Sequence, residues 1–119
     1  MQTRSLSDAI RSYFEAYNTK DRQVVEALIA DDFRFTSPSD DQIDRAAYFA
    51  RCWANAERIK AIRIEEIAPV TDPTVGDAAF VRYAVETTAG ARFRNVEYHR
   101  FEDGRLKTVE VYFGALPAR

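Results

Sequence analysis

Glu97 and His99 are the side chains in this chain best suited to move a proton. They stand two positions apart in a predicted strand, 92–101, so both point to the same face of a sheet. An imidazole exchanges a proton near neutral pH, and a carboxyl group in an apolar interior can act as acid or base. The alternatives are a purely structural histidine and a glutamate that is exposed or forms a salt bridge with Arg82 or Arg94.

The hairpin at Asp103-Gly104 decides which face of the sheet these two side chains share. A two-residue turn places both on the side of Thr108 and Glu110, whereas a three-residue turn places them with Val109 and Val111. Only the second arrangement directs the acid and the imidazole toward an apolar interior.

Aromatic and apolar side chains supply candidate walls for a cavity. Tyr13 and Tyr17 lie one helical turn apart, and a buried tyrosine hydroxyl needs a partner such as a pocket acid or a ligand oxygen. The other candidates are apolar and form either pocket walls or plain core. They are Phe33, Phe35, Phe49, Trp53, Val109, Val111 and Phe113.

The N-terminal elements that position these residues follow from capping signals and hydrophobic period. Ser5–Asp8 predicts the start of a helix with an apolar stripe, and Asp21 predicts the start of a short second helix. The period changes to alternation at Phe33–Phe35, in a strand that Pro38 stops. A third helix is predicted over about 42–57, capped by Asp40 or Asp41.

Four strands are predicted in the second half of the chain, at 59–70, 78–88, 92–101 and 106–113. Helices followed by a run of antiparallel strands indicate an α+β domain with helices on one face of a bent sheet. A chain of 119 residues with 46% hydrophobic content fits one globular domain over 1–119. The other sheet face, with Tyr83 and Tyr112, is expected to pair in a homodimer.

The order of these motifs resembles the nuclear transport factor 2-like superfamily, and within it the SnoaL-like polyketide cyclases and steroid Δ-isomerases. The motifs are Asp21 before the second helix, Ala30-Asp31-Asp32-Phe33, Ser37-Pro38, and Asp103-Gly104-Arg105-Leu106. The resemblance implies a single SnoaL-like domain with a cystatin-like, cone-shaped α+β barrel. It also implies a pocket for a small hydrophobic molecule and, commonly, a homodimer.

Steroid isomerases of this superfamily use a carboxylate base before the proline, a tyrosine on the first helix and a protonated acid on a late strand. The tyrosine matches Tyr13, and the late acid matches Glu97 or His99, which favours the inward-facing hairpin register. The base position holds Ser37, which has no useful basicity and argues against authentic steroid isomerase activity. Asp40 lies three residues later on a predicted loop, and its use as a substitute base is a guess.

Composition excludes several other classes of function. A net charge of −2 gives no basic patch for nucleic acid or an acidic membrane surface, and no apolar run is long enough to span a membrane. One histidine and one cysteine, Cys52, predict no metal centre and no internal disulfide. With 4 glycines and no phosphate-binding loop, no cofactor is expected. The N-terminus has no signal region, so a cytoplasmic protein is expected.

Three functions fit these observations. The first is an isomerase, cyclase or dehydratase that transfers a proton on an apolar carbonyl compound, with Glu97 or His99 as acid–base group and Tyr13 polarising the carbonyl. The second is a non-catalytic protein that binds a hydrophobic ligand in the same space. The third is a dimeric interaction module with a filled core, which a pocket of roughly 300 Å³ or more would contradict.

Overall fold

The computed structural model describes residues 5–113 and opens with two helices, α1 (Leu6–Thr19) and α2 (Arg22–Leu28). Both helix starts are as predicted. The Ser5 side chain accepts a hydrogen bond from the Asp8 amide at 3.0 Å, and Asp21 occupies the N-cap of α2. The apolar stripe of α1 is buried against the sheet, which fixes the direction in which its tyrosines point.

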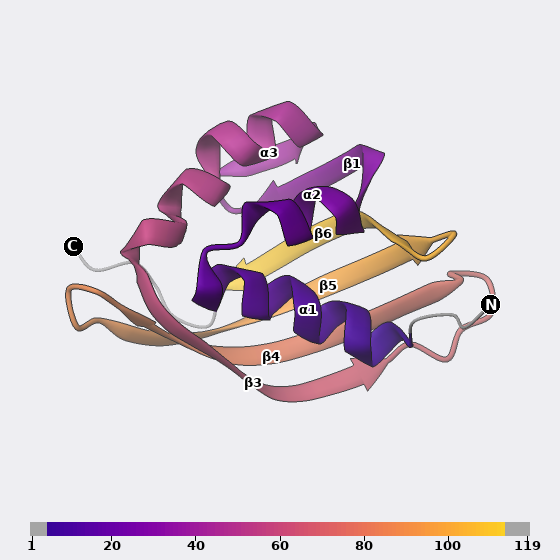
Figure 1. The fold of residues 1–119 in the computed structure, drawn as a ribbon. Coiled ribbons are helices and arrows are strands. Elements are labelled where there is room, and N and C mark those ends of the chain that lie inside the picture. Colours follow the sequence, from indigo (N-terminus) through magenta and orange to yellow (C-terminus); the bar gives the residue numbers. More distant parts are fainter. Residues whose placement is uncertain (1–4, 114–119) are drawn as a thin grey trace.

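Six strands in the described part of the chain form one sheet in the order β2-β1-β6-β5-β4-β3. Their bounds are Ile29–Ser37 for β1, Asp40–Ile43 for β2, Ile59–Pro69 for β3, Asp77–Thr87 for β4, Arg92–Glu102 for β5 and Arg105–Phe113 for β6. The β1–β6 pair is parallel and the others are antiparallel. The helices lie together over one face of this curved sheet (Figure 1), so the predicted α+β architecture is confirmed.

The third helix differs from the prediction in its start and in its type. Residues 40–43 pair with β1 as the extra strand β2, so Asp40 and Asp41 do not cap a helix. The cap is Asp44, whose Oδ1 accepts from the Ala47 amide at 2.9 Å. The α-helix α3 covers only Arg45–Arg51, and the 3₁₀-helix η1 follows at Trp53–Arg58. The pairing of residues 40–43 with β1 therefore outweighed the capping tendency of Asp40 and Asp41.

The β5–β6 hairpin has a two-residue turn and yet turns Glu97 and His99 inward. Glu102 pairs with Arg105, but a bulge between the pairs Arg100–Thr108 and Phe101–Leu106 shifts the register. Glu97 therefore lies opposite Val111, and His99 opposite Val109, on the face that the helices cover. The inward facing is confirmed, whereas its predicted cause, a three-residue turn, is wrong.

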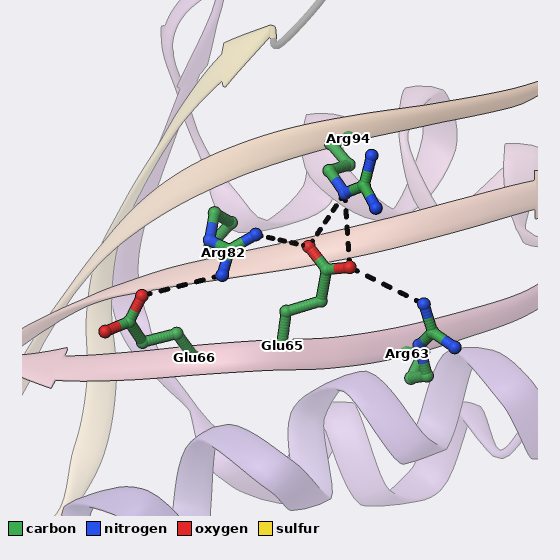
Figure 2. Close-up of polar contacts among 5 residues, drawn as sticks. All are labelled: Arg63, Glu65, Glu66, Arg82 and Arg94. Atoms are coloured by element: carbon green, nitrogen blue, oxygen red, sulfur yellow. Dashed lines mark hydrogen bonds and ion pairs between the residues drawn. The ribbon is translucent and has the colours of Figure 1, made fainter.

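The outer face of the sheet carries an ion-pair cluster that joins β3, β4 and β5 (Figure 2). The Glu65 carboxylate contacts Arg82 at 2.7 Å, Arg94 at 2.9 Å and Arg63 at 3.5 Å. The hydrogen bond from Arg94 holds the pKa of Glu65 below its ordinary value. Arg82 and Arg94 lie on this outer face, whereas Glu97 is buried on the inner face, so neither arginine pairs with Glu97 as the sequence had left open.

An aromatic patch occupies the same outer face beside the ion pairs. Phe80 packs on Tyr98 at a centroid distance of 4.9 Å, and Tyr112 is 53% exposed. The prediction that Tyr83 belongs to this face is wrong. It is 4% exposed and points inward with Val81, because the two residues share one phase of the strand. None of the described helices is long and apolar enough to cross a membrane.

Candidate functional site

A cavity of about 310 Å³ lies between the helices and the inner face of the sheet. Its volume is at the lower end of the range for ligand sites, roughly 300–1,000 Å³. Most of its lining is apolar or aromatic, with polar groups at separate places in the wall. The lining residues are Tyr13, Phe14, Tyr17, Phe35, Ser37, Ser39, Asp40, Cys52, Asn55, Ile59, Ile62, Tyr83, Val85, Phe93, Asn95, Glu97, Val111 and Phe113.

The carboxylate of Glu97 is the acidic group that β5 contributes to this lining. Its side chain is nearly buried, and each oxygen has one polar partner. Oε2 accepts a 2.5 Å hydrogen bond from the Tyr83 hydroxyl, and Oε1 lies 2.8 Å from Nε2 of His99. Asn95 in turn donates from Nδ2 to the Tyr83 oxygen at 3.3 Å. The phenol is a firm donor, because burial and the neighbouring Glu97 raise its pKa above the ordinary value.

His99 is completely buried and is not among the residues that line the cavity. Its ring stacks on Phe14 at 5.5 Å and meets the edge of Tyr13 at 5.2 Å. The second ring nitrogen, Nδ1, has no hydrogen-bond partner within residues 5–113. The imidazole therefore reaches the cavity only through Glu97.

Three tyrosine hydroxyls form a chain beside this pair. The Tyr48 hydroxyl bonds to that of Tyr13 at 2.9 Å and to that of Tyr17 at a shorter distance. All three rings are nearly or fully buried. Burial raises the pKa of Tyr13 well above its ordinary value of 10, and the neighbouring tyrosines raise it further. The hydroxyls consequently stay protonated at neutral pH and remain hydrogen-bond donors.

Sequence reasoning missed Tyr48, the centre of this chain of hydroxyls. The pattern of the predicted helix over 42–57 puts Ala46, Phe49, Cys52 or Trp53, and Ala56 on its apolar face. The helix that begins after Asp44 instead buries Tyr48 together with Phe49. The signal was Asp44 itself, an N-cap residue with a hydrogen bond to the amide three positions on. Asn95 and Tyr83 were also not assigned to the site. Asn95 shares the inner face of β5 with Glu97, and Tyr83 shares the inner face of β4 with Val81, so alternation along each strand was a signal for both.

The structure divides the predicted site residues into two groups. Those that line the cavity are Tyr13, Tyr17, Phe35, Ser37, Glu97, Val111 and Phe113. Those that lie outside the lining are Phe33, Phe49, Trp53, His99 and Val109. Phe33 and Val109 are fully buried core, Trp53 packs on Tyr17 at 4.8 Å, and Phe49 lies under the guanidinium of Arg22.

A second polar group lies in the cavity wall at the β1–β2 turn. Ser37 pairs with Asp40 across this turn, and its hydroxyl donates to Asp40 Oδ2 at 3.3 Å. Arg51 from α3 forms an ion pair with Asp40 Oδ1 at 2.6 Å. Cys52 lies beside them, and burial, followed by the charge of Asp40, raises the pKa of its thiol to about 12. The thiol is therefore a poor nucleophile at neutral pH.

No group of three or more His, Cys, Asp or Glu side chains within the described range 5–113 is arranged to hold a metal ion. What the cavity offers chemically is a carboxylate linked to an imidazole, a set of phenol donors and a second carboxylate at the β1–β2 turn. These groups bind and release protons and hydrogen-bond to a polar ligand atom.

Solved structures with the same fold cover almost the whole chain. An NTF2-like protein of unknown function from Cytophaga hutchinsonii aligns with a TM-score of 0.74 at 16% identity, over 95% of this chain and 94% of that one. A cystatin-fold protein from Novosphingobium aromaticivorans gives 0.72 at 19% identity, over 91% and 97%. IdmH from Streptomyces antibioticus, described as a candidate polyketide cyclase, gives 0.70 at 21% identity, over 91% of each chain.

These likenesses establish the cystatin-like, NTF2-like fold that the order of motifs implied. No curated protein sequence matches this chain significantly. The family model described as the SnoaL-like domain matches residues 10–109, which span the elements that build the cavity except the first turn of α1 and the end of β6. The chain therefore belongs to the SnoaL-like domain family of the NTF2-like superfamily.

Proposed function

We propose that this protein binds a small apolar carbonyl compound in the cavity and catalyses cofactor-independent proton transfer on it. The reaction class is that of an isomerase, cyclase or dehydratase. The observation that carries the proposal is the Glu97 carboxylate, which lines an apolar cavity while His99 backs it at 2.8 Å. A carboxylate held in this way can take a proton from a carbon next to a carbonyl and return it elsewhere.

In this mechanism Glu97 is the catalytic acid–base group and His99 is its positioning partner. His99 does not line the cavity, so it acts on the substrate only through the carboxylate. The imidazole fixes one oxygen of Glu97 and Tyr83 fixes the other, which holds the carboxylate in one orientation. A fixed base near the reacting carbon avoids reorganisation during the reaction.

Tyr13 or Tyr17 supplies the donor for the carbonyl oxygen. Three hydroxyl protons are available in the tyrosine chain, and its two hydrogen bonds use two of them. If Tyr48 accepted from both neighbours, its own buried proton would have no acceptor within residues 5–113, which is unfavourable. Tyr48 therefore donates to one neighbour, and that neighbour's proton is free for an oxygen in the cavity. Such a donor stabilises the enolate that forms after proton removal.

Two further observations bear on the proposed reaction class. Ser37 stands where the steroid isomerases carry their base, and its hydroxyl is engaged with Asp40, so steroid isomerisation is not part of the proposal. IdmH is described as a candidate polyketide cyclase, which supports cyclisation as one form of the chemistry. At 21% identity that likeness supports the fold, and the reaction rests on the Glu97 site.

The proposal is tested by hydrogen–deuterium exchange at the carbon next to the carbonyl of 1-tetralone, a small bicyclic ketone, in D₂O. Glu97→Gln is expected to lower the protein-catalysed exchange rate by roughly 10²–10⁴-fold, the usual contribution of general acid–base catalysis. His99→Gln is expected to lower it less. The matched control is Glu66→Gln, an exposed glutamate on the outer face. Equal exchange by wild type and Glu97→Gln contradicts the assignment.

The second candidate function is binding of a hydrophobic molecule without turnover. It is favoured by Ser37, because the position that carries a base in the steroid isomerases has none here. Binding of the ketone is then expected to survive Glu97→Gln and to weaken in Phe35→Ala, which removes an aromatic ring from the cavity wall. A filled interaction module is disfavoured, because a cavity of about 310 Å³ remains open.

We also propose a homodimer through the outer sheet face. Phe80 and Tyr112 are 43% and 53% exposed there, and Tyr98 packs beside Phe80. Aromatic side chains on an otherwise charged sheet face favour a symmetric partner that covers them.

A further inference from the structure

We propose that the β1–β2 end of the cavity is a second polar subsite, in which Asp40 accepts a hydrogen bond from a hydroxyl group of the ligand. The substrate is thus an apolar carbonyl compound with a hydroxyl at its opposite end. This inference rests on the proposed function in that the ligand occupies the same cavity. It adds the chemical class of the far end of that ligand.

Asp40 has the burial and the surroundings of a binding group. Its side chain is only 10% exposed and belongs to the cavity lining. Arg51 holds one oxygen at 2.6 Å, and the Ser37 hydroxyl donates to the other. These contacts come from helix α3 and from the neighbouring strand β1, so they fix the carboxylate from two sides.

Asp40 and Glu97 lie at different ends of the cavity wall. Asp40 begins β2 and Glu97 lies on β5, with β1 and β6 between them in the sheet. Three strand spacings amount to about 14 Å along the sheet. The space between them is apolar, with Phe35 and Val111 in its wall. A ligand that fills this space meets a carboxylate at each end.

The chemistry of Asp40 selects a hydrogen-bond donor. A carboxylate has about four acceptor positions. In the described chain Oδ2 accepts from Ser37 and weakly from Cys52, whereas Oδ1 forms the ion pair with Arg51 but accepts no hydrogen bond. A carbonyl or an anion would place acceptor against acceptor there. A cation has little to gain, because Arg51 already balances the charge. A neutral hydroxyl is the group that gains a charge-assisted hydrogen bond.

The size of the cavity narrows the class further. A volume of about 310 Å³ is near the lower limit for ligand sites. We therefore expect a compact ligand, such as a fused bicyclic ring, whose carbonyl meets the tyrosine donors while its hydroxyl meets Asp40.

The test compares three probes of one ring system: 6-hydroxy-1-tetralone, 6-methoxy-1-tetralone and unsubstituted 1-tetralone. Dissociation constants are measured by calorimetry with the wild type, Asp40→Asn and the control Asp41→Asn, whose side chain is exposed. The wild type is expected to bind the hydroxy probe about tenfold or more tightly than the methoxy probe, as a hydrogen bond to a charged group predicts. Asp40→Asn should lose most of this preference and Asp41→Asn should keep it.

Equal binding of the hydroxy and methoxy probes by the wild type overturns the subsite, and this comparison needs no variant to fold. An unchanged preference in Asp40→Asn overturns it as well. Deuterium exchange of the same probes is measured separately and reports on the proposed function. A wild type that prefers the hydroxy probe but catalyses no exchange supports the subsite and refutes proton transfer.

Discussion

Replacing Tyr48 by phenylalanine removes the hydroxyl that joins Tyr13 and Tyr17. Two buried hydrogen bonds disappear, and each is worth about 1 kcal/mol net. Tyr13 and Tyr17 also keep hydroxyls without their former partner, which adds to the loss. Both line the cavity, where water can reach them and offset part of that addition. We expect a loss of roughly 2–3 kcal/mol in the free energy of unfolding.

Urea unfolding followed by circular dichroism measures this loss. In thermal unfolding, an entropy of unfolding of roughly 2.1 cal/mol/K per residue means that losing 2 kcal/mol of unfolding free energy lowers the melting temperature of this chain by about 8 °C. The matched control is Tyr98→Phe, because Tyr98 lies on the outer face and packs on Phe80. It is expected to change stability by less than about 0.5 kcal/mol.

A double-mutant cycle separates the shared hydrogen bond from general packing. Tyr13→Phe alone is expected to lose about 1 kcal/mol, and less in a chain that already carries Tyr48→Phe. A Tyr48→Phe variant as stable as Tyr98→Phe would refute the reasoning, because the hydroxyl chain would then contribute nothing to the folded state.

Burial raises the pKa of the Cys52 thiol to about 12, so its stabilising effect is complete below the ordinary value of 9.0 and is lost as pH rises from there. The urea midpoint should fall more steeply between pH 9 and 11 in wild type than in Cys52→Ser; parallel curves would contradict this. Leu106→Ala, at a fully buried position, should lose roughly 2–5 kcal/mol in urea unfolding. Tyr112→Asp on the outer face should give monomers in sedimentation experiments, whereas Asp41→Asn should not.

Local signals in the sequence predicted most of the elements and the general position of the cavity. The Ser5 cap, the stripe of α1, the stop at Pro38 and the alternation of the long strands all depend on neighbours within a few residues. Such neighbours are visible in any sequence, because capping and side-chain alternation are properties of the local backbone.

Tertiary structure decided how the site is assembled, although several of its residues were predicted from the sequence. The bulge in β6 turns Glu97 inward despite a two-residue turn. In the sequence it shows only as a break in the alternation of apolar residues between Leu106 and Val109. Pairing of β2 with β1 moved the start of α3 and thereby placed Tyr48 at the centre of the hydroxyl chain. It also brought Asp40 into the cavity wall. Strand pairing fixed each of these, and local signals such as the Asp44 cap and the phase change on β6 do not say which residues pair.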